Sequence, residues 1–234
     1  MSKPASTDAR TAIFARLRDA VPAQELPMPE VAAYYDASPS PNPADQVARF
    51  CERARSWQAE VVETDRAHWL DALVSVLDAK GVRTLLAGRD TAISQALETG
   101  AVPARLHWYD GPIDSCKDFL FDEVDAGITT TRGGIAETGS LILWPDRHEP
   151  RTLSLVPPLH IAVLDAAHLH ETLHGAMRAQ AWANDLPTNA LLVTGPSKTA
   201  DIQRLLVYGA HGPDRKSTRL NSSHRLLSRM PSSA

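Results

Sequence analysis

The chain has 234 residues, of which 43% are hydrophobic and 22% charged, so it can form a core, and bulk disorder is excluded. It contains no run of 18 apolar residues and no apolar leader, so we expect neither a membrane span nor a secretory signal. The 19 basic and 27 acidic residues of 1–213 give this part a formal net charge of −8, which argues against a nucleic-acid partner.

The N-terminal part is predicted to hold one helix and an extended arm. Ile13, Leu17 and Val21 recur at helical spacing, which predicts an amphipathic helix over 8–19. Prolines recur from residue 22 to residue 43, a pattern typical of an extended linker. We therefore divide the chain into this helix and proline-rich arm (1–44) and an α/β domain (45–213).

Short apolar runs alternate with helical patterns through the domain. Val47, Phe50, Cys51, Ala54 and Trp57 keep the spacing of one helix face, which makes Cys51 a core thiol. Further helices are expected over 65–78, 91–97, 166–182 and 198–205, and strands over 59–63, 84–87, 105–109, 127–131, 140–144, 161–164 and 190–194. This alternation predicts a three-layer α/β fold with a mostly parallel sheet that helices cover on both faces.

The two cysteines, Cys51 and Cys116, lie far apart in the sequence and form no CxxC pair. Two cysteines exclude a disulfide framework and any four-cysteine metal or iron–sulfur site within the chain. We therefore expect a cytoplasmic protein that holds no metal or cofactor of its own.

The last segment, 214–234, differs abruptly from the rest in composition. Its run from Asp214 to His224 resembles one reading frame of a common sequencing-library adapter. We therefore expect 214–234 to be a non-native tail that contributes nothing to the fold. The alternative is a natural basic tail that contacts RNA or acidic lipid.

The segment 133–139, Gly-Gly-Ile-Ala-Glu-Thr-Gly, is the first candidate site. Its glycines permit a tight turn and the close approach of a ligand. Glu137 is the candidate catalytic group, and Gly134, Thr138 and Gly139 are candidate ligand contacts. The alternative is a plain turn with a capping carboxylate.

His160 is the second candidate ligand contact, in the segment 154–163. A double proline precedes it, and the histidine then enters a predicted buried strand. The alternative is a hydrogen-bonded structural histidine, which is the more common role at such a position.

The third candidate site follows the predicted strand over 190–194. A turn at Gly195, with Ser197 and Thr199 opening a helix, leaves free N–H groups for an anion, and Lys198 adds positive charge. Asp201 is a further candidate contact. The alternative is a helix cap without a ligand. We predict that this segment and the Glu137 turn share one pocket at the carboxyl ends of the strands.

The segment His170-Glu-Thr-Leu-His174 matches the HExxH zinc motif on a predicted helix. No glutamate follows Glu171 to serve as the usual third ligand, and Met177 stands where the longer form of the motif requires glycine. We therefore interpret these histidines as a solvated helix face and expect no zinc.

The segments 134–143, 154–163, 195–202 and 207–213 together resemble the LUD-domain family, in particular the C-type subunit of bacterial lactate-utilisation systems. The resemblance covers about residues 45–213. It implies a fold like that of the sugar-phosphate isomerase and CoA-transferase group. It also implies a last apolar strand after residue 213, where this chain has the adapter-like tail.

The same resemblance implies an accessory subunit that works with two iron–sulfur proteins in the oxidation of L-lactate to pyruvate. The clusters are then expected only in those partner subunits, and this chain holds at most a small-molecule or anion pocket. One alternative is a free-standing transferase- or ligase-type enzyme acting on a phosphate- or CoA-bearing metabolite. Another is a regulatory ligand sensor, and whether the chain is an enzyme stays open.

Overall fold

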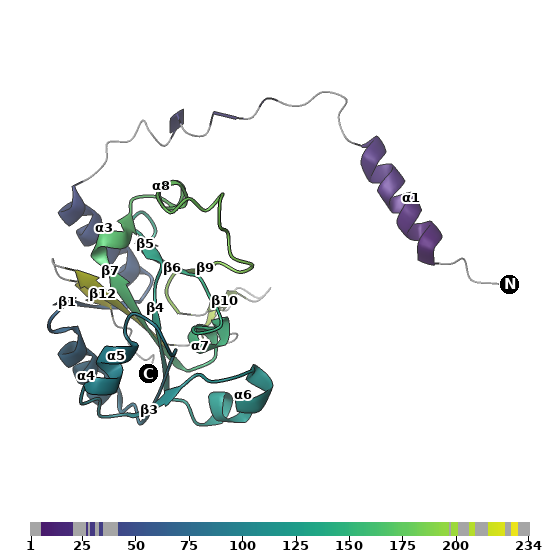
Figure 1. Ribbon diagram of the computed structural model, residues 1–234. Helices are drawn as coiled ribbons and strands as arrows, with labels where there is room; N and C mark the ends of the chain where they lie inside the picture. The colour runs from purple at the N-terminus through teal and green to yellow at the C-terminus, as the bar shows by residue number, and fades with distance from the viewer. Residues whose placement is uncertain are drawn as a thin grey trace. The chain divides into compact units, whose positions relative to one another are not determined.

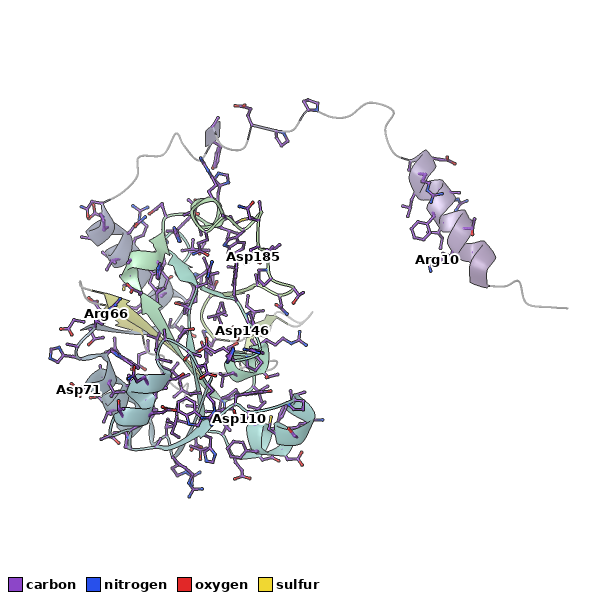
Figure 2. The ribbon with its side chains drawn as sticks, in the orientation of Figure 1. Arg10, Arg66, Asp71, Asp110, Asp146 and Asp185 are labelled. Carbon is purple, nitrogen blue, oxygen red and sulfur yellow. The ribbon has the colours of Figure 1, made fainter. Side chains whose placement is uncertain are left out.

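The computed structural model describes residues 6–20, 27, 29–30, 33–34, 42–196, 198–200, 206–208, 215–222 and 226–228. The chain divides into two units, 1–39 and 40–234. The first unit contains the helix α1 (Ser6–Asp19), close to the helix that the spacing predicts (Figure 1). On α1 the guanidinium of Arg10, labelled in Figure 2, lies 5.5 Å from the ring centre of Phe14.

A seven-stranded sheet forms the centre of the second unit and confirms the predicted α/β fold (Figure 1). Its order is β1 (Glu60–Asp65), β13 (Leu226–Ser228), β12 (Arg215–Ser222), β7 (Leu159–Asp165), β4 (Ala126–Thr130), β2 (Thr84–Ala87) and β3 (Arg105–Trp108). Every pairing in this sheet is parallel except those of β13. The sheet is therefore mostly parallel, as the alternating pattern predicts.

Helices cover both faces of this main sheet. They are α3 (Pro43–Ser56), α4 (Trp69–Lys80), α5 (Ser94–Thr99), α6 (Ile113–Asp122) and α7 (Arg151–Leu155). On β7, Ile161 packs with the residues of α4 and α5, whereas Ala162 packs with those of α3. Because successive strand residues point to opposite faces, the layers are helix, sheet and helix. The sequence patterns did not predict α6 or α7.

The ends of the helices follow ordinary capping chemistry. Asn42 precedes α3, and its Oδ1 accepts the N–H of Ala44 at 2.7 Å. Pro43 then occupies the first turn, where its missing N–H costs nothing. At the far end of α4, Gly81 takes the left-handed conformation with φ 62°.

A second, smaller sheet lies against α3 and was not predicted. Its order is β8 (Leu169–His170), β5 (Gly133–Ile135), β6 (Ser140–Leu143) and β9 (Leu191–Val193). β6 runs antiparallel to both β5 and β9, so β5 and β9 run in the same direction. A separate pair joins β10 (Lys198–Ala200) to β11 (Leu206–Tyr208).

Two predicted helices are wrong. The helix expected over 166–182 is a 3₁₀ turn (Ala166–His168), then β8, then the short helix α8 (Leu173–Ala179). Thr172 explains the late start, because its backbone is extended and its hydroxyl accepts the N–H of Gly175 as a helix cap. In the helix expected over 198–205, residues 198–200 form β10, and 201–205 lie outside the described residues.

The segment 215–222 also differs from expectation, because it forms β12 and pairs in parallel with both β7 and β1. We expected 214–234 to contribute nothing to the fold. A gap between two strands can be filled by any backbone, since the ladder hydrogen bonds do not depend on side chains. The non-native origin of 214–234 stays a prediction. Among the described helices none is long and apolar enough to cross a membrane.

Candidate functional site

The turn between β5 and β6 carries Glu137 and Thr138, and it packs directly on the end of α3. Gly139 in this turn has φ 69°, and a Cβ there would lie 2.3 Å from the backbone nitrogen of Ala54. The N–H of Glu137 donates to the carbonyl of Glu171 at 3.0 Å. Glycine is therefore required at 139 for both its conformation and its contact with α3.

A second turn, after β9, packs on the same helix end. Gly195 has φ 72°, and a Cβ there would lie 2.4 Å from the carbonyl oxygen of Trp57. Backbone contacts thus hold the α3 end, the Glu137 turn and the segment after β9 against one another.

These three segments surround an open pocket with a volume of about 630 Å³. It is lined by Arg53, Ser56, Trp57, Glu137, Thr138, Ser140, Thr194 and Pro196. Hydroxyl groups form a chain across it: Thr138 Oγ1 lies 2.7 Å from Ser140 Oγ, which lies 2.5 Å from Thr194 Oγ1. This size is in the usual range for small-molecule sites.

The pocket also presents two opposite charges that do not pair. Within the described part of the chain, neither the Arg53 guanidinium nor the Glu137 carboxylate has a hydrogen bond or an ion pair. Both side chains are exposed. Each charge is therefore available to a ligand.

The structure brings together part of the predicted site. Glu137 and Thr138 line the pocket, Gly139 and Gly195 shape it, and the segment before Ser197 reaches it through Thr194 and Pro196. Both turns follow the carboxyl ends of strands, as predicted, but these strands, β5 and β9, belong to the smaller sheet. The helix expected to open at 197–199 is not formed over 198–200.

The remaining residues of the predicted anion site receive only a partial description. Ser197 and Asp201 lie outside the described residues, as do the side chains of Lys198 and Thr199, whose backbones belong to β10. Their role as ligand contacts stays a prediction.

Two other predicted ligand contacts lie away from the pocket lining. His160 is 1% exposed in β7, where its Nε2 lies 2.9 Å from Thr129 Oγ1. A Cβ at Gly134 would lie within 3.0 Å of Leu169, Leu164 and Phe50. Both positions fit the structural alternative, a bonded core histidine and a tightly packed backbone.

The HExxH match does not lie on one helix. His170 belongs to β8 and His174 to α8, so the two rings lack the helical spacing that the motif requires. The Glu171 carboxylate pairs with Arg49. Burial lowers the pKa of His170, whose Nε2 lies 3.1 Å from Gln180 Nε2. This geometry removes the reason to consider a zincin site.

The sequence patterns missed one partly buried carboxyl group, that of Glu149, which lies beside the carboxyl end of β4. Its Oε1 accepts the N–H of Thr130 at 2.8 Å, and its Oε2 accepts the Thr130 hydroxyl. Burial raises the pKa of Glu149, and the hydrogen bonds from Thr130 oppose that shift. Asp146, labelled in Figure 2, holds the loop because its Oδ1 accepts the N–H of Glu149 at 2.8 Å.

Buried carboxyl groups with raised pKa values often mark functional sites. The space beside Glu149 is only about 10 Å³, however, which is room for one water molecule. No motif in the sequence distinguishes Glu149 from a surface glutamate. We therefore treat the larger pocket as the candidate site.

The chain is similar to known proteins over most of its length. The LUD domain family model matches residues 47–216. An uncharacterized protein of Neisseria meningitidis serogroup B is 33% identical over 212 residues, covering 88% of this chain and 90% of the relative. Lactate utilization protein C of Oceanobacillus iheyensis is 25% identical over 178 residues, covering 72% of this chain and 75% of the relative.

A solved structure supports the fold. The crystal structure of a DUF162 family protein from Deinococcus radiodurans is similar with a TM-score of 0.57 at 21% identity, covering 78% of this chain and 99% of that chain. The family match spans most of the domain, including both turns of the pocket and the end of α3. The chain therefore belongs to the LUD-domain family.

Proposed function

We propose that this chain is an accessory subunit of a system that oxidises L-lactate to pyruvate, with iron–sulfur clusters in its partner subunits. The observation that carries the proposal is the similarity to proteins named Lactate utilization protein C, which extends over 178 residues in the Oceanobacillus relative and 162 in an Exiguobacterium relative. The family match covers the same region.

The cysteines support the assignment of electron transfer to partners. Cys51 is buried in the α3 core, and burial raises the pKa of its thiol to about 12. Cys116 lies on α6, in a separate part of the fold. The chain has two cysteines, fewer than the four thiolates that usually hold a cluster, and this supports our proposal that the clusters lie in the partner subunits.

The pocket gives the subunit its own means of handling a small molecule. Arg53 supplies a cation for an anionic group, and the Thr138–Ser140 hydroxyls supply donors and acceptors. A carboxylate such as that of Glu137, which has no partner among the described residues, can accept a hydrogen bond from a ligand or remove a proton from it. We propose that substrate, intermediate or effector binds at this place.

Affinity purification of the chain from its native host, grown on L-lactate, tests the proposed assembly. We expect two partner proteins whose visible absorbance shows iron–sulfur clusters. The same protein purified alone should not oxidise L-lactate. A chain that purifies without partners and turns over a CoA- or phosphate-bearing substrate would instead support the transferase or ligase alternative.

The role of Glu137 gives a first prediction. Glu137→Gln keeps the shape of the side chain and removes its charge. We therefore expect normal folding but a growth rate on L-lactate that is at least tenfold lower. Growth on pyruvate serves as the control, as does Glu52→Gln, an exposed glutamate on α3 outside the pocket lining. Wild-type growth of the Glu137→Gln strain would assign the turn to structure alone.

A further inference from the structure

The pocket between α3 and the Glu137 turn is larger than lactate needs. L-Lactate has six heavy atoms, whereas sites of several hundred cubic ångströms hold ligands of drug size. The pocket has a volume of about 630 Å³, which is the size of a site for a drug-sized ligand. The pocket therefore has room for an effector larger than the three-carbon acids of the proposed reaction.

We infer that this pocket binds a nucleotide, with its base against Trp57, its ribose hydroxyls on Glu137 and its phosphate on Arg53. The inference names the ligand class of the pocket assigned above and rests on that assignment. Three kinds of group line the pocket, and each matches one part of a nucleotide.

The apolar part of the lining fits a planar base. Trp57 is 45% exposed although it is a large apolar side chain, and Pro196 lies in the same lining. Aromatic rings stack on nucleobases whatever the base, because every base has a π face. The exposed part of the indole and the proline ring form the apolar part of the lining that would contact a base.

The Glu137 turn fits the sugar. Vicinal ribose hydroxyls donate well to a carboxylate, which is how acidic residues hold ribose in dinucleotide-binding proteins. The Glu137 carboxylate has no partner in the described part of the chain. Thr138, Ser140 and Thr194 line the same pocket, and their hydroxyls can both donate and accept hydrogen bonds.

Arg53 fits the phosphate. The guanidinium is planar, and its parallel N–H groups match phosphate oxygens. Carbonyls at a helix end would normally repel an anion. Here the Arg53 carbonyl accepts from the Ser56 hydroxyl at 2.7 Å and from the Trp57 N–H at 3.2 Å. The Arg53 carbonyl at the helix end is therefore already hydrogen-bonded within the chain, and the Arg53 guanidinium supplies a positive charge for a phosphate.

Arg53 and Glu137, which have no partner in the described part of the chain, restrict the chemical class of the ligand further. A bare phosphate would be repelled by Glu137, and a bare cation would be repelled by Arg53. A ligand that carries an anionic group and neutral hydroxyl donors at separate positions satisfies both. A nucleotide has this arrangement, with the ribose between base and phosphate.

Isothermal titration of the full chain with AMP tests the inference, with adenosine, inorganic phosphate and L-lactate as comparison probes. We expect AMP to bind, with its Kd raised at least tenfold by Arg53→Gln, Glu137→Gln or Trp57→Ala. Trp57→Phe, which keeps an aromatic face, should retain most of the affinity. Adenosine should bind more weakly than AMP and be insensitive to Arg53→Gln.

Two control variants remove a charge outside the pocket and so test whether a change in affinity comes from the pocket or from the net charge of the protein. Arg105→Gln, at the exposed start of β3, and Glu52→Gln should leave the Kd for AMP unchanged. The absence of AMP binding at millimolar concentration, or binding that no pocket variant weakens, would overturn the inference. L-Lactate binding that depends on Glu137, without AMP binding, would overturn the nucleotide class and leave the proposed pocket and subunit role standing.

Discussion

Two glutamates show how position decides what a carboxyl group can do. Glu137 is exposed at a pocket, without a partner among the described residues, and is free to meet a ligand. Glu149 is partly buried and hydrogen-bonded through both oxygens to Thr130, at the end of a parallel strand. Glu149 also packs beside Gly88, where a Cβ would lie 2.6 Å from its Cγ. The first is suited to binding and the second to joining the loop 145–150 to the main sheet.

Stability should depend on pH through Glu149. Burial raises its pKa in the folded state above the ordinary 4.5, so the folded protein holds this proton more tightly than the unfolded chain does. The contribution is therefore fully present below pH 4.5 and is lost as the pH rises through the folded pKa. Glu149→Gln cannot titrate, so its free energy of unfolding should not show this decline.

Denaturant unfolding of wild type and Glu149→Gln from pH 4.5 to 7.5 measures the effect. The stability of the wild type minus that of the variant should fall as the pH rises across this range. Glu52→Gln, exposed on α3, is the control and should give a flat difference. A flat difference for Glu149→Gln as well would show that the carboxyl group is not perturbed by burial.

At the scale of elements, the end of α3 organises the candidate site, because the turns at Gly139 and Gly195 both press on its backbone. The sequence predicted α3 from its apolar spacing and identified the Glu137 turn from its glycines. It could not show that the two meet, since that contact depends on the small sheet. β5 is three residues long and rich in glycine, so no alternating pattern marks it.

The sequence could not predict the late start of α8 either, because it too depends on the small sheet. Thr172 is compatible with a helix interior and with a helix cap, and only the pairing of β8 with β5 decides between them. The long strand β7, by contrast, was predictable, because six of its seven residues are buried and a continuous apolar run reports burial on both faces. Arg53 and Trp57 carried no functional signal before the fold was known.

The contact of Gly139 with α3 gives a stability prediction. Gly139→Ala places a methyl group 2.3 Å from the Ala54 nitrogen in a left-handed backbone, so we expect a loss of about 2 kcal/mol or more. Gly175→Ala is the matched control, since Gly175 lies in α8 without a positive φ, and a Cβ there would meet no atom nearer than 3.4 Å. It should gain about 0.5–1 kcal/mol from helix propensity. Equal effects of the two changes in denaturant unfolding would contradict the role of the α3 contact.

At the scale of the whole molecule, the main sheet contains a mismatch between position and sequence. β12 pairs in parallel with β7 and β1 and antiparallel with β13, so it lies in the interior of a mostly parallel sheet. Such strands are normally apolar runs, yet β12 reads Arg-Lys-Ser-Thr-Arg-Leu-Asn-Ser, with one apolar residue. The family match ends at residue 216, at the start of this strand. Neighbouring strands on both sides would thus favour a more apolar strand than this chain has here.

Introducing apolar residues into β12 should therefore stabilise the protein. Ser217, Thr218 and Arg219 pair with Ile161, Val61 and Val62, so we expect the triple variant Ser217→Val, Thr218→Ile, Arg219→Val to raise Tm by several degrees. At about 2–4 °C per kcal/mol for a chain of this size, a rise of about 5 °C corresponds to about 1–3 kcal/mol. The control variant Arg105→Val, at the exposed start of the edge strand β3, adds apolar surface outside β12 and should leave Tm unchanged. A Tm that falls in the triple variant, or rises equally in the control, would mean that this position in the sheet does not select for apolar residues.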